Sequence, residues 1–354
     1  MNARIAGMGW VTPLGADLAT VWERLAAGEA PEPKVLTNPE TGALHRYLAV
    51  PPKLVDHLAR NPRLRRSSAV SYYAVAAGLA ALEDAGMTLD PGAAARTAVV
   101  FAISDGGVIY TRRFYEQIVT QGANAASPLL FPETVYNAPA SHLSALLGID
   151  GASYTLVGDN SVGLAALKFA EQLLELGDLD RVIVVGAEEI DWVICEAYRD
   201  WRLARTSAPR RADAPWKAWL GEGAAAIVLA REGPLAVEAL HLGVAFPRRT
   251  DAPAAIDRVL AELVPRGAVQ RVVSCANGTF ADGAESAAVA RHFPAVTQRP
   301  LMPKHALGEA PGASALVQVI AAALECKRGQ SRRVLVPVVG FNQQASAAIV
   351  ARAD

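Results

Sequence analysis

Short runs of apolar, often β-branched residues recur along the chain, and longer stretches rich in alanine and leucine separate them. The runs that predict buried strands cover 3–11, 97–103, 180–188, 224–230, 270–276, 333–341 and 346–352. Helical spacing of apolar residues covers 67–87, 161–178, 254–265 and 312–329. This alternation of strands and helices predicts a largely parallel sheet with helices on both faces.

One position divides the chain into two parts. Near REGPLAVEA (231–239) a strand ends, Gly-Pro follows, and another strand-like run begins. We therefore predict an N-terminal half, residues 1–232, and a C-terminal half, residues 233–354, which share one core.

Two segments lack a regular pattern. Residues 103–142 are the most irregular stretch, and long excursions of this kind usually bind a ligand or form an interface. Residues 206–223 are predicted to be a loop, in which Trp216 and Trp219 are expected to pack locally.

Composition narrows the class of protein. Apolar residues make up 52% of the 354 positions and charged residues 19%, as in a globular protein with an extensive core. The formal net charge is −1, so no large net field favours nucleic acid as a partner. The three cysteines, Cys195, Cys275 and Cys326, have no metal-like or redox-like spacing, and their odd number argues against a disulfide framework.

The lengths of the apolar runs indicate where in the cell the protein is located. No apolar run reaches the length of about 18 residues that crosses a bilayer, and the N-terminus has no apolar stretch long enough for a signal peptide. We expect a cytoplasmic protein with no membrane and no nucleic-acid partner.

Several separated segments carry a family resemblance. They are RIAGMGWVTPLGADLATVWERLAAGEAP (4–31), the block from FPETVYNAPASH to VIVVGAEE (131–189), LGEGAAAIVLARE (220–232), ANGTFADGAE (276–285), KHALGEAPGASALVQVIAAAL (304–324) and GFNQQASAAIV (340–350). In this order they resemble the β-ketoacyl synthase branch of the thiolase superfamily over nearly the whole chain. The resemblance implies an α/β fold of two similar halves stacked as five layers, α-β-α-β-α, with a dimer formed across a central strand.

The turn TLVGDNSVG (155–163) matches the place where these synthases carry their nucleophilic cysteine, and here the matching residue is Asn160. A nucleophile before a helix gains from the helix N-terminus, which stabilises a thiolate and then the acyl oxyanion. A carboxamide cannot form the acyl thioester that covalent catalysis requires. Asparagine is also a common turn or N-cap residue, so that role stays open beside a role in a pocket.

Both histidines of the family are also replaced. ANGT (276–279) matches the site of the first histidine and places Asn277 there, and LGEA (307–310) places Glu309 at the second. A carboxylate at the second site would repel the developing negative charge of an enolate unless it were protonated or paired. The resemblance therefore implies that the chain has no catalytic residues for condensation.

Other residues keep or leave the family pattern. Lys304 stands where the family has its active-site lysine and is able to pair with Glu309, and Thr279 keeps its place in the turn, so both are candidates for shaping a pocket. His305 and His142 do not match the catalytic histidines, and none of the cysteines is assigned a catalytic role. Asn342 to Gln344 replace small glycines of the family's last loop.

The replacements resemble one group of relatives in particular. Chain length factors are catalytically silent partners of ketosynthases, and their nucleophile turn commonly has Glu-Gln in place of Ala-Cys. Asp159-Asn160 is similar and one methylene shorter at each position. The resemblance implies a non-catalytic subunit that pairs with an active ketosynthase and limits chain length in type II polyketide, aryl polyene or fatty-acid-like biosynthesis.

The resemblance to chain length factors also implies partner proteins. No bound cofactor is expected, since an acyl carrier protein would deliver acyl chains on phosphopantetheine. Carrier proteins are acidic, and two basic clusters are available to meet one, although such clusters are most often solvated surface: Arg60, Arg63, Arg65 and Arg66, and Arg112 with Arg113. In the irregular segment, Tyr110, Phe114 and Tyr115 are candidates to wall a partner's acyl tunnel or to pack the segment onto the core.

Two other functions stay open at this point. One is an acyltransferase or hydrolase on acyl thioesters, with Glu309 as general base and Asn160 or Asn277 as oxyanion donors. The other is a homodimeric scaffold of a biosynthetic complex that never touches substrate.

Overall fold

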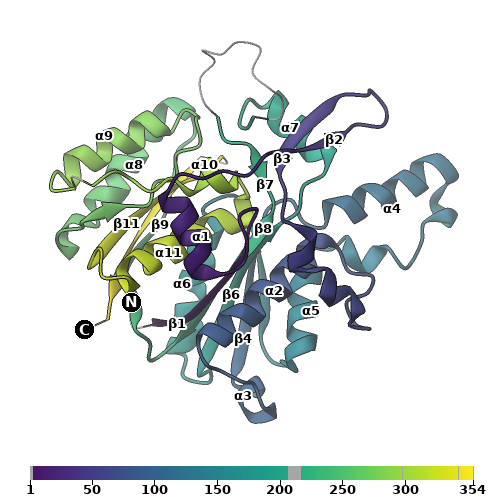
Figure 1. The fold of residues 1–354 in the computed structure, drawn as a ribbon, viewed down its shortest axis with the longest axis horizontal. Helices are drawn as coiled ribbons and strands as arrows, with labels where there is room; N and C mark the ends of the chain where they lie inside the picture. The colour runs from purple at the N-terminus through teal and green to yellow at the C-terminus, as the bar shows by residue number, and fades with distance from the viewer. Residues whose placement is uncertain (1–2, 206–216, 297, 342, 354) are drawn as a thin grey trace.

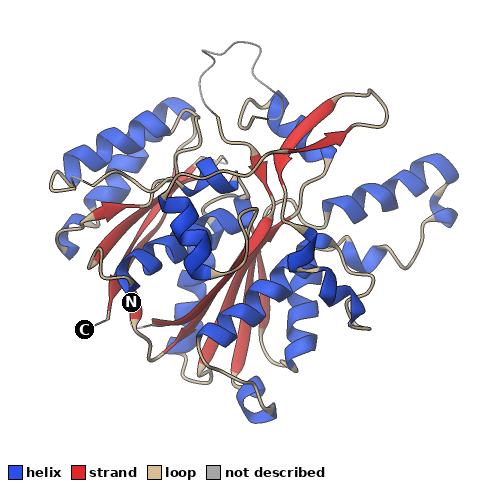
Figure 2. Cartoon of the chain, viewed as in Figure 1, coloured by secondary structure: helices blue, strands red, loops and turns tan. Residues whose placement is uncertain are grey.

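The computed structural model describes residues 3–205, 217–296, 298–341 and 343–353. Trp216 and Asn342, which the sequence singled out, lie outside the described residues. The strands and helices are shown in Figure 1 and, by type, in Figure 2.

Among the described residues, the main sheet has nine strands in the order β10-β11-β12-β9-β1-β8-β6-β4-β5. Their bounds are β1 Arg4–Val11, β4 Thr97–Ile103, β5 Ser153–Val157, β6 Arg181–Glu188, β8 Gly223–Ala230, β9 Leu235–Ala245, β10 Arg271–Val272, β11 Arg333–Val339 and β12 Gln344–Arg352. Strands β1 and β9 pair at only two positions, Arg4 with Ala236 and Ile5 with Leu235. The sheet is thus two half-sheets, β5-β4-β6-β8-β1 and β9-β12-β11-β10, joined along this short ladder.

The expectation of a largely parallel sheet is wrong, because five of the eight strand pairs described in the main sheet are antiparallel. Strands β4, β5 and β6 are parallel neighbours, as are β10 and β11, but β8 runs antiparallel to both β6 and β1. Strands β11 and β12 are antiparallel because the few residues between them are too short for the crossover that a parallel pair needs.

Helices form three layers around the half-sheets. Their bounds are α1 Leu18–Ala26, α2 Ala69–Asp84, α3 Pro91–Ala95, α4 Val108–Gln121, α5 Ala138–Leu147, α6 Val162–Glu175, α7 Trp192–Asp200, α8 Ala252–Ala261, α9 Asp282–His292, α10 Pro303–Leu307 and α11 Pro311–Lys327. Helices α2 and α5 cover the outer face of the N-terminal half-sheet, and α8 and α9 that of the other. Helices α6 and α11 lie between the half-sheets, which gives the α-β-α-β-α order that the resemblance implied.

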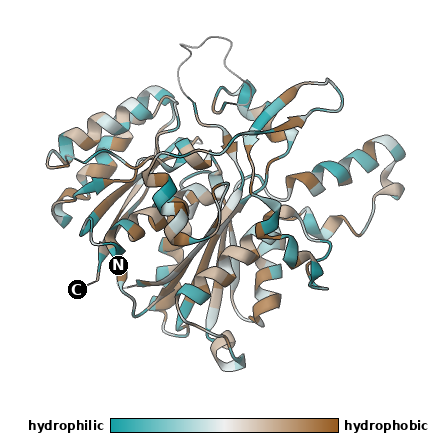
Figure 3. Cartoon of the chain, viewed as in Figure 1, coloured by the Kyte–Doolittle hydropathy of each residue, from teal (hydrophilic) through white to brown (hydrophobic). Residues whose placement is uncertain are grey.

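The central helix α11 is buried on every side. All of its residues from Pro311 to Cys326 are buried, and its few polar side chains, such as Gln318, are hydrogen-bonded inside the layer. Close packing there needs glycine: a Cβ on Gly186 of β6 would lie 2.2 Å from the carbonyl oxygen of Gly312 in α11. Figure 3 shows the same distribution, with hydrophobic strands in the centre and most hydrophilic segments on the outer elements.

The segment 103–142 is more regular than its sequence suggested. It contains α4, which begins at Val108 and extends away from the stacked halves in Figure 1, and the start of α5. Only Val108 of α4 is buried, so the helix lacks the wide apolar stripe by which periodicity identifies a core helix. The small sheet β2-β3-β7, with bounds Lys34–Thr37, Leu44–Leu48 and Leu220–Gly221, also had no clear signal.

Residues 231–234 link β8 to β9 at the place where the sequence predicted a division of the chain. The division into halves 1–232 and 233–354 stays a prediction. In the part of the chain that the structure describes, no helix is long and apolar enough to cross a membrane.

Candidate functional site

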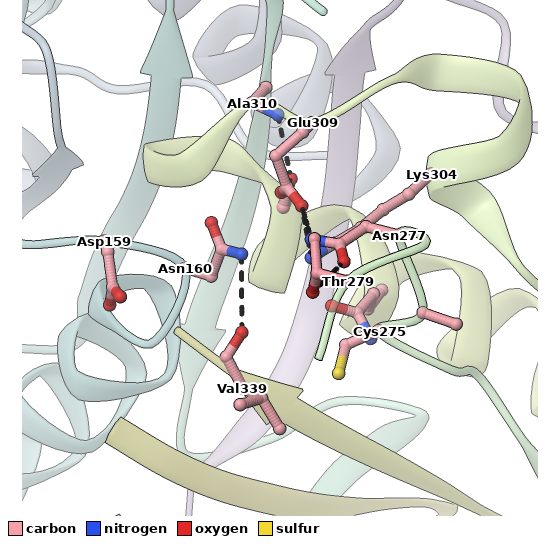
Figure 4. A network of polar contacts seen from close by, with 12 residues as sticks. Asp159, Asn160, Cys275, Asn277, Thr279, Lys304, Glu309, Ala310 and Val339 are labelled. Carbon is pink, nitrogen blue, oxygen red and sulfur yellow. Dashed lines mark hydrogen bonds and ion pairs between the residues drawn. The ribbon is translucent and has the colours of Figure 1, made fainter. Parts of the chain in front are cut away.

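Asn160 lies in the turn between β5 and α6, and its side chain is fully buried. Its Nδ2 group donates to the carbonyl oxygen of Val339 at 3.5 Å, at the end of β11 (Figure 4). Its Oδ1 atom has no hydrogen-bond partner among the described residues. The N-cap position of α6 belongs to Ser161, so the alternative role of Asn160 as the N-cap is wrong.

Asp159, the other half of the Asp-Asn pair, is also buried. Its Oδ1 atom accepts from the backbone N–H of Ser161 at 3.2 Å. A Cβ on Gly340 would lie 2.0 Å from the Oδ2 atom of Asp159, so the carboxylate fills the space that a side chain at position 340 would need. The turn is thereby held against the loop that follows β11.

Asn277 and Glu309 contact each other directly. The Nδ2 group of Asn277 donates to Oε2 of Glu309 at 2.7 Å, and the Oδ1 atom of Asn277 accepts from the Thr279 hydroxyl at 2.6 Å. The other oxygen of Glu309, Oε1, accepts from the Ser314 hydroxyl at 2.9 Å. Both oxygens of this carboxylate are therefore occupied, and the side chain is fully buried.

Lys304 completes the cluster, since its Nζ atom lies 2.9 Å from Oε2 of Glu309. Both side chains are almost completely buried. Burial lowers the pKa of Lys304, but the Glu309 carboxylate beside it outweighs that effect, and the net pKa is raised. The lysine therefore stays charged, and the two groups form a neutral buried ion pair.

Figure 4 shows these side chains converging from separate elements. Asn160 precedes α6, Asn277 and Thr279 precede α9, Lys304 belongs to α10, and Glu309 precedes α11. A cavity of about 20 Å³ lies beside Lys304 and Ser314, which is room for about one water molecule. The cluster is thus a closed polar network rather than an open binding site.

The cysteines are unsuited to act as replacement nucleophiles. Burial raises the pKa of Cys195 and of Cys326 to about 12. Burial also raises the pKa of Cys275, whose Sγ atom donates to Oε2 of Glu285 at 2.7 Å. All three thiols are buried, and a neutral thiol is a poor nucleophile.

The two histidines lie apart from the network. His142 places Nε2 2.6 Å from Oε1 of Glu133 and 3.2 Å from the Ser67 hydroxyl. His305 follows Lys304 in α10 but is exposed. Neither contacts Asn160, Asn277 or Glu309.

The three aromatic candidates all lie on α4, away from the buried network. Tyr110 donates to the carbonyl oxygen of Arg66 at 3.0 Å, and the Phe114 ring lies 5.8 Å from that of Phe131. Tyr115 is 65% exposed. Tyr110 and Phe114 therefore anchor the segment, and Tyr115 projects from it.

Buried acids at the ends of strands escaped the sequence analysis. Oε1 of Glu188, at the end of β6, accepts from the backbone N–H of Ser104 at 2.5 Å and of Gly312 at 3.0 Å. Burial raises the pKa of Glu188 well above its usual value, and that of Glu189 and of Glu222 to about 7. An acidic residue after an apolar strand was the available signal, but sequence alone does not say that it turns inward.

Two half-sheets on a shared pair of helices, with polar turns meeting where those helices begin, define a thiolase-like protein. The family model for "Beta-ketoacyl synthase, N-terminal domain" matches residues 3–233. The chain therefore belongs to the β-ketoacyl synthase family.

Curated relatives are distant. A 3-oxoacyl-(acyl-carrier-protein) synthase 2 of Vibrio cholerae is 26% identical over 234 residues, which are 64% of this chain and 56% of the relative. A protein of the same name from Staphylococcus aureus is 27% identical over 187 residues, 52% of this chain and 46% of the relative. The matched region spans about half the length of these relatives.

Solved structures match over almost the whole chain. The ishigamide ketosynthase/chain length factor has a TM-score of 0.80 at 22% identity and covers 99% of both chains. A β-ketoacyl synthase from Burkholderia phymatum has a TM-score of 0.76 at 20% identity, also over 99% of both. A ketosynthase in complex with its chain length factor from Xenorhabdus doucetiae has a TM-score of 0.74 at 18% identity, over 99% of this chain and 98% of that one. At these identities the likeness shows the shared fold.

The ion pair makes a first prediction. Replacing Lys304→Met leaves Glu309 buried without its cation, and we expect the free energy of unfolding to fall by about 3 to 5 kcal/mol. The double variant Lys304→Met/Glu309→Gln should recover much of that loss. Chemical denaturation measures both.

The control is the exposed pair Arg96–Asp180, whose side chains are about half exposed at a separation of 2.8 Å. Arg96→Gln should lower the free energy of unfolding far less, because solvent screens this exposed pair. Equal losses for Lys304→Met and Arg96→Gln would contradict the role assigned to the buried pair.

The buried acids make a second prediction. Because the folded pKa of Glu189 and of Glu222 is raised above the unfolded value, the native state binds more protons between about pH 4.5 and 7. The free energy of unfolding should therefore fall as pH rises through this window, by on the order of 3 kcal/mol for each acid with a fully realised shift.

Urea denaturation at a series of pH values measures this slope. Burial lowers the pKa of His305, which acts in the opposite sense, but that side chain is exposed and its contribution is smaller. A free energy of unfolding that rises steadily from pH 5 to pH 8 would show that the acids are not buried as described.

Proposed function

We propose that this chain is a non-catalytic subunit of the chain length factor kind, which pairs with an active ketosynthase. The observation that carries the proposal is that Asn160, Asn277 and Glu309 stand at the places matched to the family's cysteine and two histidines, with Asn277, Glu309 and Lys304 bonded in one buried cluster. An amide at the helix start offers no nucleophile, and the acid that replaces the second histidine is neutralised by Lys304 at 2.9 Å. The chemistry would then reside in the partner subunit.

Two outward surfaces support a partner. Strand β5 ends the sheet and pairs only with β4 among the described strands, so one edge of its backbone is free to pair with another chain. Its Tyr154 and Val157 are exposed, at 43% and 56%. On α4, Tyr115 and Val119 are exposed as well and lie one helical turn apart. Apolar side chains beside a free strand edge are typical of a surface that another subunit covers.

An acyl carrier protein is the second proposed partner. The basic clusters at 60–66 and 112–113 meet around Tyr110, since Tyr110 bonds to Arg66 and the guanidinium of Arg113 lies 5.5 Å from the ring centroid. This basic surface fits an acidic carrier that brings acyl chains on phosphopantetheine. Arg112 is partly neutralised by Asp191 at 3.0 Å, so the exposed arginines would supply most of the attraction.

The other functions have weaker support. A hydrolase or acyltransferase would need Glu309 as a free base, but both its oxygens are engaged and its side chain is fully buried. The homodimeric scaffold differs from our proposal in its partner and in never touching substrate. Co-expression with candidate synthases, followed by size-exclusion chromatography and mass measurement, separates the two.

The third prediction concerns inertness. The purified chain should acquire no adduct on the peptide 155–163 from acyl-carrier thioesters or from a cerulenin-type electrophile, and an active ketosynthase serves as the positive control. Adducts on cysteine do not bear on this result, because the peptide 155–163 contains none and all three cysteines of the chain lie elsewhere and are buried.

Asn160→Cys extends this test. The substitution places a thiol at the start of α6, but both histidines are still missing, so we expect no condensation from the variant alone. Robust condensation by this single variant, or a stoichiometric adduct of the unmodified chain on 155–163, would refute the proposal of a silent site.

The fourth prediction concerns the product. In the reconstituted pair, Tyr115→Ala should lengthen the acyl product without abolishing condensation, because the bulky side chain would end the partner's tunnel. Tyr110→Ala and Phe114→Ala should lengthen it too, with a lower melting temperature, since these rings also anchor α4.

Leu176→Ala is the matched control, because Leu176 is also a large exposed apolar residue, 74% exposed, just after α6. Product length by mass spectrometry is measured beside a thermal melt. An unchanged product distribution from all three stably folded α4 variants would remove this helix from the tunnel wall.

A further inference from the structure

A row of four aligned residues crosses the junction of the two half-sheets. Arg4 of β1 pairs with Ala236 of β9, Ala236 pairs with Ala351 of β12, and Ala351 pairs with Arg333 of β11. Laterally paired residues point to the same face of a sheet, and neighbouring strands are about 4.8 Å apart. Two arginines therefore stand on either side of a floor made by two alanines.

A hollow of about 190 Å³ lies over this floor. Its lining includes all four residues of the row, together with Glu238, Arg332 and Arg352. A second hollow of about 340 Å³ adjoins it, because Arg332 and Arg352 line both. Both ends of the chain lie on this side of the molecule (Figure 1), far from α4.

The arginines that line the hollow differ in whether an acidic side chain pairs with them. Glu238 is engaged by Arg333, whose Nε and terminal nitrogen lie 2.7 and 2.6 Å from its two oxygens. Arg4 and Arg352 have no ion pair or hydrogen-bond acceptor for their side chains within the ranges that the structure describes. Guanidinium groups of like charge repel each other when they are gathered around one space, unless an anion lies between them.

Arg333 is fixed in place on a second side. A Cβ on Gly267 would lie 2.8 Å from its terminal nitrogen, so the glycine leaves the room that the guanidinium occupies. Gln270 also accepts through Oε1 from the backbone N–H of Arg333 at 2.7 Å. One wall of the hollow is therefore fixed in place. Because Glu238 engages Nε and one terminal nitrogen of Arg333, the paired N–H donors for a tetrahedral oxyanion would come from Arg4 and Arg352.

We propose that this hollow, over Arg4, Ala236, Ala351 and Arg333 with Arg352 at its rim, binds a phosphate group. The small side chains of Ala236 and Ala351 leave space for the phosphate. Arg4 and Arg352 supply the positive charge that no described acid pairs, and Glu238 holds Arg333 in position. The adjoining hollow gives room for whatever the phosphate is esterified to. The site is independent of the proposed pairing with a ketosynthase.

Isothermal titration of the whole chain with inorganic phosphate tests the proposal, at an ionic strength kept constant with chloride. We expect saturable binding of one phosphate, weakened by about tenfold or more in Arg4→Gln and in Arg352→Gln. Arg46→Gln removes the same charge from an exposed arginine of β3, in the separate small sheet, and should leave the affinity within about twofold. Thermal melts confirm that each variant is folded.

A parallel titration with ribose 5-phosphate separates the two sources of the group. Tighter binding of the ester than of inorganic phosphate would support the site and assign it to organic phosphates. Equal affinity would support a site for free phosphate. Absence of saturable binding by either probe, or equal weakening by Arg46→Gln, would overturn the proposal, because the attraction would then be only that of a basic surface.

Discussion

Helices α6 and α11 are buried between the two half-sheets, and this burial fixes what happens at their first turns. A helix start leaves N–H groups without partners inside the helix, and here water is not available to take them. The chain supplies the acceptors itself: Oε1 of Glu188 accepts from Gly312, and Oδ1 of Asp159 accepts from Ser161. Polar residues must therefore gather where the two central helices begin, and the candidate site is formed from them.

The same burial explains why the replaced site is closed. A charge in this layer is tolerated only with a partner, so Glu309 is stable beside Lys304 and is further bonded by Asn277 and Ser314. Asn160 brings no charge and needs no counter-ion, although its Oδ1 atom remains without a partner among the described residues. The thiolase-like fold is retained, and in its central layer Asn277 and Glu309 are bonded to each other.

Features able to meet other molecules lie on the periphery instead. The free edge of β5 lies at one end of the strand order, in the N-terminal half-sheet. Helix α4 follows β4, the strand beside β5. The arginine hollow lies at the junction of the half-sheets, where β1 meets β9. Because the central layer is buried and closely packed, we expect binding at either place to leave its structure unchanged.

The sequence alone predicted the elements that have the strongest apolar pattern. The run TAVVFAI predicted β4 at its observed bounds, and the pattern over 312–329 predicted α11 to within two residues, because long buried elements carry an unbroken apolar pattern. The resemblance also placed Asn160, Asn277, Lys304 and Glu309 as counterparts of one site. The exposed helix α4 was missed because its stability does not depend on an apolar face that periodicity can report.

Only the tertiary structure decided what those site residues do. Lys304 and Ser314 are each five positions from Glu309, but Asn277 comes from the turn before α9, and no local pattern gives its distance from Glu309. The direction of Asn160 toward Val339, rather than toward its own helix, likewise depends on how the C-terminal half-sheet packs on α6. Sequence fixes which groups exist and which elements they flank, whereas contacts between distant segments exist only once both half-sheets have closed on the helices between them.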